Sequence, residues 1–230
     1  MRVGQFGDLD TRRLDRTGTP EVILAEGKRD EHLAQLCEAF VDEADWAIVS
    51  RLTPDRVSLV EGEAWETDYH DEARLAVLRT DEAQLPDHGG RVAVVAAGTS
   101  DVGVAEEARL TARLTGSRTQ RAYDVGVAGP HRLERALAGM ETEPDVYVCV
   151  AGREAALPTV LAASVDPPVV AVPTSIGYGH GGGGESSLSS VLQSCAPLLA
   201  VNIDAGVPAG LCASTIARQV GRARRDRDTA

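Results

Sequence analysis

The pattern of hydrophobic and polar positions becomes regular from Arg91 onward. Five apolar runs rich in Val and Ala alternate there with stretches that can form helices. The runs are RVAVVAAG (91–98), TQRAYDVG (119–126), DVYVCVAG (145–152), PVVAVPTS (168–175) and LAVNIDAG (199–206). Near-continuous apolar runs are typical of strands that are buried on both faces of a sheet. The helices that follow the runs are expected to begin near Asp101, Gly129, Glu154, Ser186 and Pro208.

Strands that alternate with helices in this way favour right-handed crossovers and a parallel sheet. We therefore expect residues 89–230 to form a five-stranded parallel sheet in a flavodoxin-like three-layer α/β sandwich. In such a sheet, ligands bind beyond the carboxyl ends of the strands. The functional site is consequently expected in the segments that follow the five runs.

Residues 1–88 have a different pattern, which predicts a small α+β domain. A helix is predicted from Asp30, because apolar residues recur at helical spacing after an acidic start. These apolar residues are Leu33, Leu36, Cys37 and Phe40. Short strands are predicted in GTPEVILAEGK (18–28), WAIVSRLT (46–53) and VSLVEG (57–62). The acidic stretch ETDYHDEA (66–73) and the segment LPDHGG (85–90) are interpreted as a linker.

Composition excludes several classes of function. The chain has 230 residues and a formal net charge of −12, which argues against nucleic acid as a partner because phosphates would be repelled. No apolar run is long enough to span a bilayer, and the N-terminus lacks the apolar segment of a secretory signal. We therefore expect a cytoplasmic protein without a membrane partner. Four cysteines without CxxC spacing argue against a disulfide framework and a structural zinc site.

The first run ends in GTSD (98–101), which offers polar groups at the start of a helix. Thr99, Ser100 and Asp101 place two hydroxyls and a carboxylate there. Free backbone N–H groups at such a helix end can bind a phosphate or a carboxylate. Taken alone, this loop is better explained by ordinary helix capping by Ser100 or Asp101.

Two further strand ends carry candidate catalytic groups. His131 and Arg132 lie near the start of the second helix, where a histidine can act as an acid or base and an arginine can clamp a phosphate. A plain surface histidine is the alternative interpretation. Glu154 is expected at the start of the third helix, either as a partner of the helix dipole or as a catalytic carboxylate.

A glycine-rich segment follows the fourth run. Gly179, Gly181 and Gly184 match the pattern GxGxxG, with Asp204 twenty residues beyond the last glycine. The dinucleotide-binding fingerprint needs its first glycine at the end of the strand, but residues 173–176 intervene here. A mobile or ligand-wrapping loop is therefore the favoured interpretation.

Several ordered motifs together resemble the LarB family, over nearly the whole chain. They are RTGTPEVILAEGK (16–28), GTSD (98–101), YDVGVAGPHR (123–132), AGREAALP (151–158), PVVAVPTSIGYG (168–179), SCA (194–196) and VNIDAG (201–206). LarB is pyridinium-3,5-biscarboxylic acid mononucleotide synthase, an enzyme in the assembly of the nickel-pincer nucleotide cofactor. Its catalytic domain is in turn similar to the AIR carboxylases and N5-CAIR mutases of purine synthesis.

The resemblance implies a reaction of nicotinic acid adenine dinucleotide with CO2. The pyridinium ring is carboxylated at C5 and the phosphoanhydride is hydrolysed, which releases AMP and the biscarboxylated mononucleotide. The ring is electron-poor, so its C5 does not attack CO2 directly. Addition of a cysteine thiolate at a neighbouring ring carbon would leave electron density at C5, and its later expulsion would restore aromaticity.

The resemblance assigns this nucleophile to Cys195, which occupies the SCA position. The other three cysteines have structural interpretations. Cys37 lies on an apolar helix face, Cys149 alternates with valines inside a strand, and Cys212 lies in the final helix among Ala and Leu. Two features depart from the family pattern: the loop GYGHGGGGESSL is unusually rich in glycine, and Gln193 stands where we expect asparagine.

The remaining roles follow from the resemblance. Glu154 and His131 are expected to handle protons, with His131 alternatively orienting CO2. Thr99, Ser100, Asp101, Arg132 and Ser175 are expected to hold phosphate, ribose or carboxylate groups. Asp124 and Asp204 are expected to bind ribose hydroxyls, or Mg²⁺ near the pyrophosphate. No tightly bound organic cofactor is expected, because the dinucleotide is the substrate.

Two other functions stay open at this point. The same scaffold serves the AIR carboxylases and N5-CAIR mutases, although Cys195, Glu154 and the 88 additional N-terminal residues count against that assignment. A non-catalytic nucleotide-binding module could use the same loops. By analogy with the purine enzymes we expect a homo-oligomer, with an octamer as the model.

Overall fold

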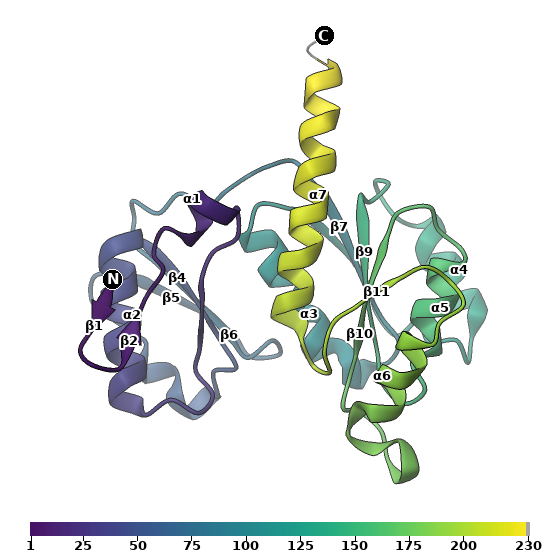
Figure 1. Cartoon of the computed structure of the whole chain (residues 1–230), viewed down its shortest axis with the longest axis horizontal. Coiled ribbons are helices and arrows are strands. Elements are labelled where there is room, and N and C mark those ends of the chain that lie inside the picture. Colours follow the sequence, from purple (N-terminus) through teal and green to yellow (C-terminus); the bar gives the residue numbers. More distant parts are fainter. Residues whose placement is uncertain (229–230) are drawn as a thin grey trace. The chain divides into compact units, whose positions relative to one another are not determined.

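A computed structural model describes residues 1–228 and divides the chain into two compact units, Met1–Leu85 and Pro86–Ala230 (Figure 1). The break falls inside the LPDHGG segment. Each unit has its own buried apolar core. Within the described residues, no helix has both the length and the apolar character needed to cross a membrane.

The second unit contains the predicted five-stranded parallel sheet, in the order β11-β10-β9-β7-β8. Its strands are β7 (Arg91–Ala96), β8 (Arg118–Ala122), β9 (Val146–Ala151), β10 (Val169–Pro173) and β11 (Leu199–Ala200). The chain leaves β7 toward β8 on one side and then returns to place β9 on the other side. The strand order therefore reverses between β7 and β9, which is where open α/β sheets bind ligands.

Five helices cover the two faces of this sheet (Figure 1). They are α3 (Val102–Leu114), α4 (Pro130–Ala138), α5 (Ala156–Ala162), α6 (Glu185–Leu192) and α7 (Gly206–Asp228). Helices α3 and α7 pack on one face against Val92, Val94 and Val148, whereas α4, α5 and α6 pack on the other face against Val95 and Cys149. Cover on both faces explains why β7, β9 and β10 are apolar at nearly every position, whereas the edge strand β8 carries polar residues. The predicted three-layer α/β sandwich is confirmed.

The first unit has a four-stranded mixed sheet in the order β3-β4-β6-β5. The strands are β3 (Val22–Leu24), β4 (Trp46–Ser50), β5 (Glu66–His70) and β6 (Leu75–Arg79). Helix α2 (Asp30–Ala44) buries Leu33, Leu36, Cys37 and Phe40, as its periodicity predicted. A short two-stranded sheet, β1 (Arg2–Val3) and β2 (Gly7–Asp8), and the helix α1 (Arg13–Thr17) precede β3.

Two expectations for this unit are wrong. The segment VSLVEG (57–62) is not a strand, because its first three residues belong to the 3₁₀ helix η1 (Pro54–Leu59) and the Val60 N–H donates to the Val57 carbonyl. The segment ETDYHDEA is not a linker, because it supplies strand β5, which pairs with β6. Its acidic residues, Glu66 and Asp68, alternate with partly buried Thr67 and Tyr69. An edge strand alternates exposed and partly buried residues, and the acidic residues on its exposed face made this segment resemble a linker.

Small residues allow α3 and α7 to approach closely. A Cβ atom at Gly210 would lie 2.5 Å from the Ala108 carbonyl oxygen and 2.8 Å from the Thr111 Cβ. Ala108, Ala112, Ala209, Ala213 and Ala217 are all fully buried. The contact between the two helices is therefore built from backbone and methyl groups, without room for an added carbon.

We predict that Gly210→Ala lowers the free energy of unfolding by about 1–3 kcal/mol, because overpacking forces the two helix backbones apart. Urea unfolding of both proteins measures the difference. Gly182→Ala is the matched control, because a Cβ atom at Gly182 meets nothing within 4 Å. Equal stability of Gly210→Ala and the wild type would contradict the close packing described above.

A buried histidine connects the start of the second unit to α7. The Nε2 atom of His88 lies 3.0 Å from the Ser214 hydroxyl, and its Nδ1 accepts the Gly90 N–H at 3.1 Å. This arrangement needs a neutral ring with its proton on Nε2. Burial, together with the positive charge of Arg218, lowers the pKa of His88.

The sign of the resulting pH dependence follows from this lowered pKa. The unfolded chain binds a proton near the ordinary histidine pKa of about 6.5, while the folded chain resists it, so stability falls as the pH drops below that value. We predict that the Tm of the wild type falls between pH 7 and pH 5, and that His88→Gln flattens this slope. His180→Gln, which alters an exposed histidine, should keep the wild-type slope.

Candidate active site

A cavity of about 470 Å³ lies at the carboxyl ends of the strands in the second unit, and we name it the strand-end cavity. Its walls come from the loops after β7, β8 and β9, from the start of α4 and from Ile176 after β10. The predicted residues that line it are Ser100, Asp101, Arg132 and Glu154. The cavity therefore forms beside the point where the strand order reverses, as expected for this class of sheet.

The buried carboxylate of Asp101 joins two of these loops. One oxygen accepts the Gly98 N–H at 2.9 Å and the other accepts the Thr174 hydroxyl at 2.8 Å. Burial raises the pKa of Asp101, and these hydrogen bonds partly offset the effect. Because both oxygens are engaged by the protein, Asp101 holds the GTSD loop against the end of β10.

Glu154 lies on an unusually tight turn after β9. Its two neighbours, Arg153 and Ala155, have φ values of 51° and 44°, in the region that side chains disfavour. A Cβ atom at Gly152 would lie 2.4 Å from the Ile176 carbonyl oxygen, so only glycine fits there. The turn is fixed by the Arg153 N–H, which donates to the Ile176 carbonyl at 2.8 Å. Strained turns of this kind are concentrated at functional sites, and this one places an exposed carboxylate in the cavity wall.

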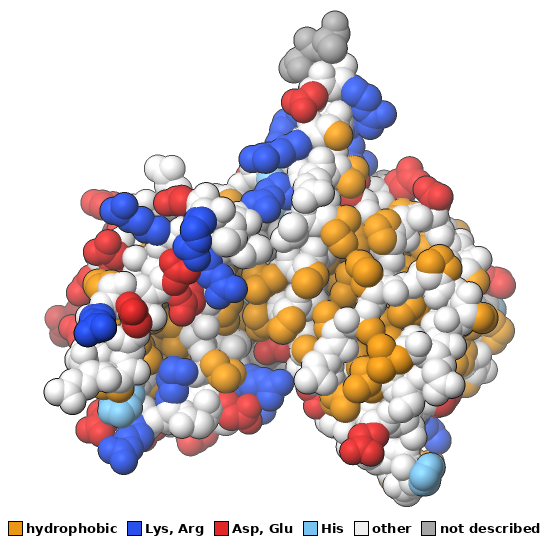
Figure 2. Space-filling model, in the orientation of Figure 1, with side chains coloured by type: hydrophobic (Ala, Val, Ile, Leu, Met, Phe, Trp, Pro, Cys, Tyr) orange, Lys and Arg blue, Asp and Glu red, His pale blue; other side chains and the backbone are white. Residues whose placement is uncertain are grey.

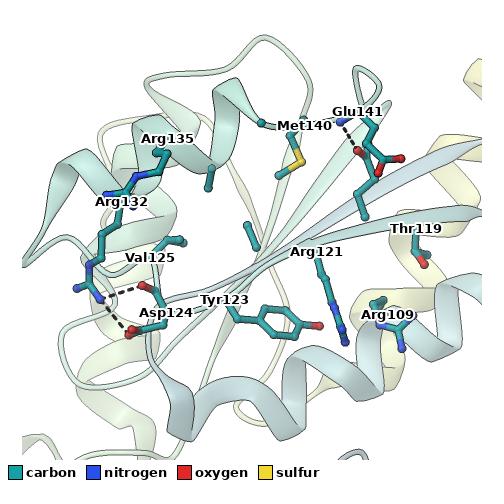
Figure 3. Close-up of a pocket in the computed structure, with 14 residues that line it drawn as sticks. Arg109, Thr119, Arg121, Tyr123, Asp124, Val125, Arg132, Arg135, Met140 and Glu141 are labelled. Carbon is teal, nitrogen blue, oxygen red and sulfur yellow. Dashed lines mark hydrogen bonds and ion pairs between the residues drawn. The ribbon is translucent and has the colours of Figure 1, made fainter.

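Arg132 shapes the opposite wall. Its guanidinium forms an ion pair with Asp124 at 3.0 Å and donates a hydrogen bond to the Asp124 carbonyl at 2.8 Å (Figure 3). Asp124 itself has a φ of 57°. The arginine therefore holds the loop after β8 in a strained conformation while its side chain lines the cavity.

Several predicted residues do not line this cavity. Thr99 and His131 are exposed and are absent from its wall. Ser175 and Asp204 meet each other instead, because the Ser175 N–H donates to the Asp204 carboxylate at 2.8 Å. Asp124 does not line the cavity either, but it forms an ion pair with Arg132, which does.

Cys195 lies away from the strand-end cavity of its own chain. It is exposed and precedes β11, whose Leu199 pairs with Val170 near the start of β10. The neighbouring Ser194 accepts the Thr159 hydroxyl at 2.8 Å, which fixes this segment against α5. Cys195 is therefore not among the residues that line the strand-end cavity, and the chain that follows it enters β11 beside the first half of β10.

The other thiols separate into buried and exposed groups. Cys37 and Cys149 are buried, as predicted, and burial raises the pKa of Cys37 to about 12. Burial also raises the pKa of Cys149. Cys212 is exposed on α7, whereas the sequence suggested an apolar setting. Cys195 and Cys212 are thus the two thiols within reach of solvent among the described residues.

Sequence reasoning overlooked two contributors to the site. Arg153 lines the strand-end cavity, donates a hydrogen bond to the Tyr178 hydroxyl at 3.0 Å and lies over the Tyr178 ring at 5.1 Å. Thr174 supports Asp101. Arg153 lies in the motif AGREAALP and Thr174 in PVVAVPTSIGYG, but only the folded loops bring their side chains to these partners.

The two candidate positions for Mg²⁺, Asp124 and Asp204, each offer a single carboxylate from the protein. No group of three or more His, Cys, Asp or Glu side chains suited to a metal ion occurs within residues 1–228. Asp124 is paired with Arg132, and Asp204 accepts the Ser175 N–H. Either position supplies one carboxylate, which fits Mg²⁺ only if substrate phosphates complete the coordination.

Comparison with known proteins agrees with this architecture. Residues 2–81 match a LarB/PurE-like N-terminal domain, and residues 91–226 match the AIR carboxylase domain. The chain is 38% identical over 217 residues to uncharacterized protein MJ0165 of Methanocaldococcus jannaschii, across 91% of this chain and 83% of the relative. The carboxylase domain contains the whole strand-end cavity. The chain therefore belongs to the AIR carboxylase family, as a LarB-type member with a LarB/PurE-like N-terminal domain.

Proposed function

We propose that this protein carboxylates the pyridinium ring of nicotinic acid adenine dinucleotide at C5, using CO2, and hydrolyses its phosphoanhydride. The products are AMP and pyridinium-3,5-biscarboxylic acid mononucleotide. The observation that carries the proposal is a LarB-type domain pair whose strand-end cavity contains both a carboxylate, Glu154, and a guanidinium, Arg132. The first suits proton transfer and the second suits a phosphate.

In the proposed reaction a cysteine thiolate adds to a ring carbon next to C5. The positive charge of the ring is neutralised, and the enamine-like product places electron density on C5. This carbon forms a bond to CO2, a base removes the C5 proton, and expulsion of the thiolate restores the aromatic ring. Water then cleaves the phosphoanhydride between the two nucleotides.

Glu154 is the proposed base for the C5 proton, because it is the carboxylate on the strained turn and it lines the cavity. Arg132 is proposed to hold the phosphate next to the ring. The apolar wall formed by Ala151, Ala155 and Ile176 is proposed to lie against the face of the ring. The proposed reaction takes no step through a metal ion, and Mg²⁺ enters only as a counter-ion of the phosphates.

The position of Cys195 leads us to propose a homo-oligomer. Cys195 does not line the cavity of its own chain, and we propose that a second copy presents its Cys195 to complete the site. The surface near this segment suits such a contact, because Leu192 and Leu199 are 67% and 50% exposed. Figure 2 shows hydrophobic side chains gathered over the region of β11 and α6. Exposed apolar patches of this kind mark sites of association.

AIR carboxylase activity is the second candidate, because the carboxylase domain match covers residues 91–226. That reaction carboxylates an electron-rich imidazole and needs no nucleophilic thiol. The two functions are therefore separated by their substrates and by the role of Cys195.

We predict that the wild type converts nicotinic acid adenine dinucleotide and bicarbonate, with Mg²⁺ present, into AMP and a mononucleotide with one added carboxyl group. Mass spectrometry identifies both products. Cys195→Ala should abolish the carboxylated product, whereas Cys212→Ala, which alters the other exposed thiol, should leave its rate unchanged. Unaltered product from Cys195→Ala would remove this thiol from the mechanism. Turnover of aminoimidazole ribonucleotide instead of the dinucleotide would establish the second candidate.

We further predict that Glu154→Gln lowers kcat at least about 100-fold, because the C5 proton loses its acceptor. The ring adduct on Cys195 should still form, and intact-protein mass spectrometry under turnover conditions should detect it. Glu134→Gln is the matched control, since Glu134 is exposed on α4 and does not line the cavity. Wild-type turnover by Glu154→Gln would rule out Glu154 as the base.

A further inference from the structure

A second and larger cavity, of about 680 Å³, adjoins the strand-end cavity, and we name it the arginine cavity. It lies along the open edge of β8, which has no further strand beside it, between α3 and α4. Four arginines line it: Arg109, Arg121, Arg132 and Arg135 (Figure 3). In a chain with a net charge of −12, this local concentration of guanidinium groups indicates an anionic ligand.

Glu106 lies outside the lining of the arginine cavity and bonds three residues of one of its walls, Arg109, Arg121 and Tyr123. The Glu106 side chain is only 8% exposed, and it accepts hydrogen bonds from Arg109 at 2.6 Å and from the Tyr123 hydroxyl at 2.5 Å. Arg121 also pairs with it at 3.2 Å. Burial alone would raise the pKa of Glu106, but these bonds and charges outweigh it and lower the pKa to about 2. The carboxylate therefore stays ionised and fixes the two guanidinium groups and the phenol ring in place.

The opposite wall is formed by Arg132 and Arg135, which lie side by side on α4 (Figure 3). Arg132 lines both cavities, so its guanidinium lies at the junction between them. Arg135 is exposed, and no carboxylate within residues 1–228 forms an ion pair with it. Two acids also line the arginine cavity, Asp124 and Glu141, and Asp124 is already paired with Arg132.

The two cavities match the two halves of a dinucleotide. Volumes of about 470 and 680 Å³ are each within the range of small-molecule sites, roughly 300–1,000 Å³. The arginine cavity also has an apolar side, formed by Met140 and the ring of Tyr123, which suits a flat base. A guanidinium between the cavities suits a pyrophosphate that joins the two halves.

We infer that the arginine cavity binds the adenylate half of the substrate, with Arg132 at the pyrophosphate and Arg135 as a second phosphate contact; this rests on the proposed function. The glycine-rich loop is the competing location, through Tyr178. That ring is 77% exposed and hydrogen-bonded to Arg153, and it does not line the strand-end cavity. The arginine cavity offers the guanidinium groups and the apolar side that an adenylate needs.

AMP alone is the probe for this inference, and isothermal titration calorimetry measures its binding to the full-length protein. Arg135→Gln should weaken AMP binding about tenfold or more, because a charge-assisted contact is lost. Nicotinic acid mononucleotide, which belongs in the strand-end cavity, should bind Arg135→Gln within about twofold of the wild type. Arg135→Lys should recover part of the AMP affinity. Arg113→Gln, at another exposed arginine, is the control and should bind AMP like the wild type.

Kinetics add an independent measurement. Arg135→Gln should raise KM for the dinucleotide while kcat stays within about twofold, because binding to the adenylate is shared by ground state and transition state. Unchanged AMP binding by Arg135→Gln would overturn the inference. So would weaker AMP binding by Tyr178→Ala alone, which would place the adenylate at the glycine-rich loop.

The failure of the inference and the failure of the proposed reaction give different results. Loss of AMP binding in Arg135→Gln, without any turnover of the dinucleotide by the wild type, supports the adenylate site and rejects the reaction. Turnover by the wild type, with AMP binding and KM unchanged in Arg135→Gln, supports the reaction and rejects the site.

Discussion

The common direction of the five strands in the second unit is the constraint on which its site depends. Parallel hydrogen bonding aligns β7, β8, β9 and β10, so their carboxyl ends and the loops that follow meet at one edge. The chain turns to opposite sides after β7 and β9, which leaves a cavity between these loops. Small residues on α3 and α7 pack with valines of the strands on one face of the sheet, and residues of α4, α5 and α6 pack on the other face.

A fixed set of polar contacts then gives the edge of the sheet its shape. Burying the carboxylate of Asp101 is unfavourable by itself, but hydrogen bonds from Gly98 and Thr174 compensate for the lost water. The same bonds hold two loops together. The strained turn around Glu154 and the paired Arg132 depend on this fixed frame, because positive φ values persist only where neighbouring contacts impose them.

The charge of the region beside β8 differs from that of the chain as a whole. Acidic residues exceed basic ones by twelve overall, yet four arginines gather beside β8. Glu106 neutralises two of them from behind and keeps them in place, and Asp124 pairs with a third. A substrate with a pyrophosphate would meet ordered guanidinium groups there, which reduces the entropy lost on binding.

The sequence by itself determined the sheet, its helices and the strand-end loops, because apolar periodicity reports burial directly. It also located Ser100, Asp101, Arg132 and Glu154, since these follow strands whose ends must meet. The sequence pattern did not predict the edge strand β5, because its acidic residues are typical of a linker although the segment pairs with β6. Only the tertiary structure decided that Cys195 lies outside the strand-end cavity and that Arg109, Arg121 and Arg135 line one cavity. The physical reason is that these residues are distant in sequence, and their proximity depends on strand order and helix packing rather than on any local pattern.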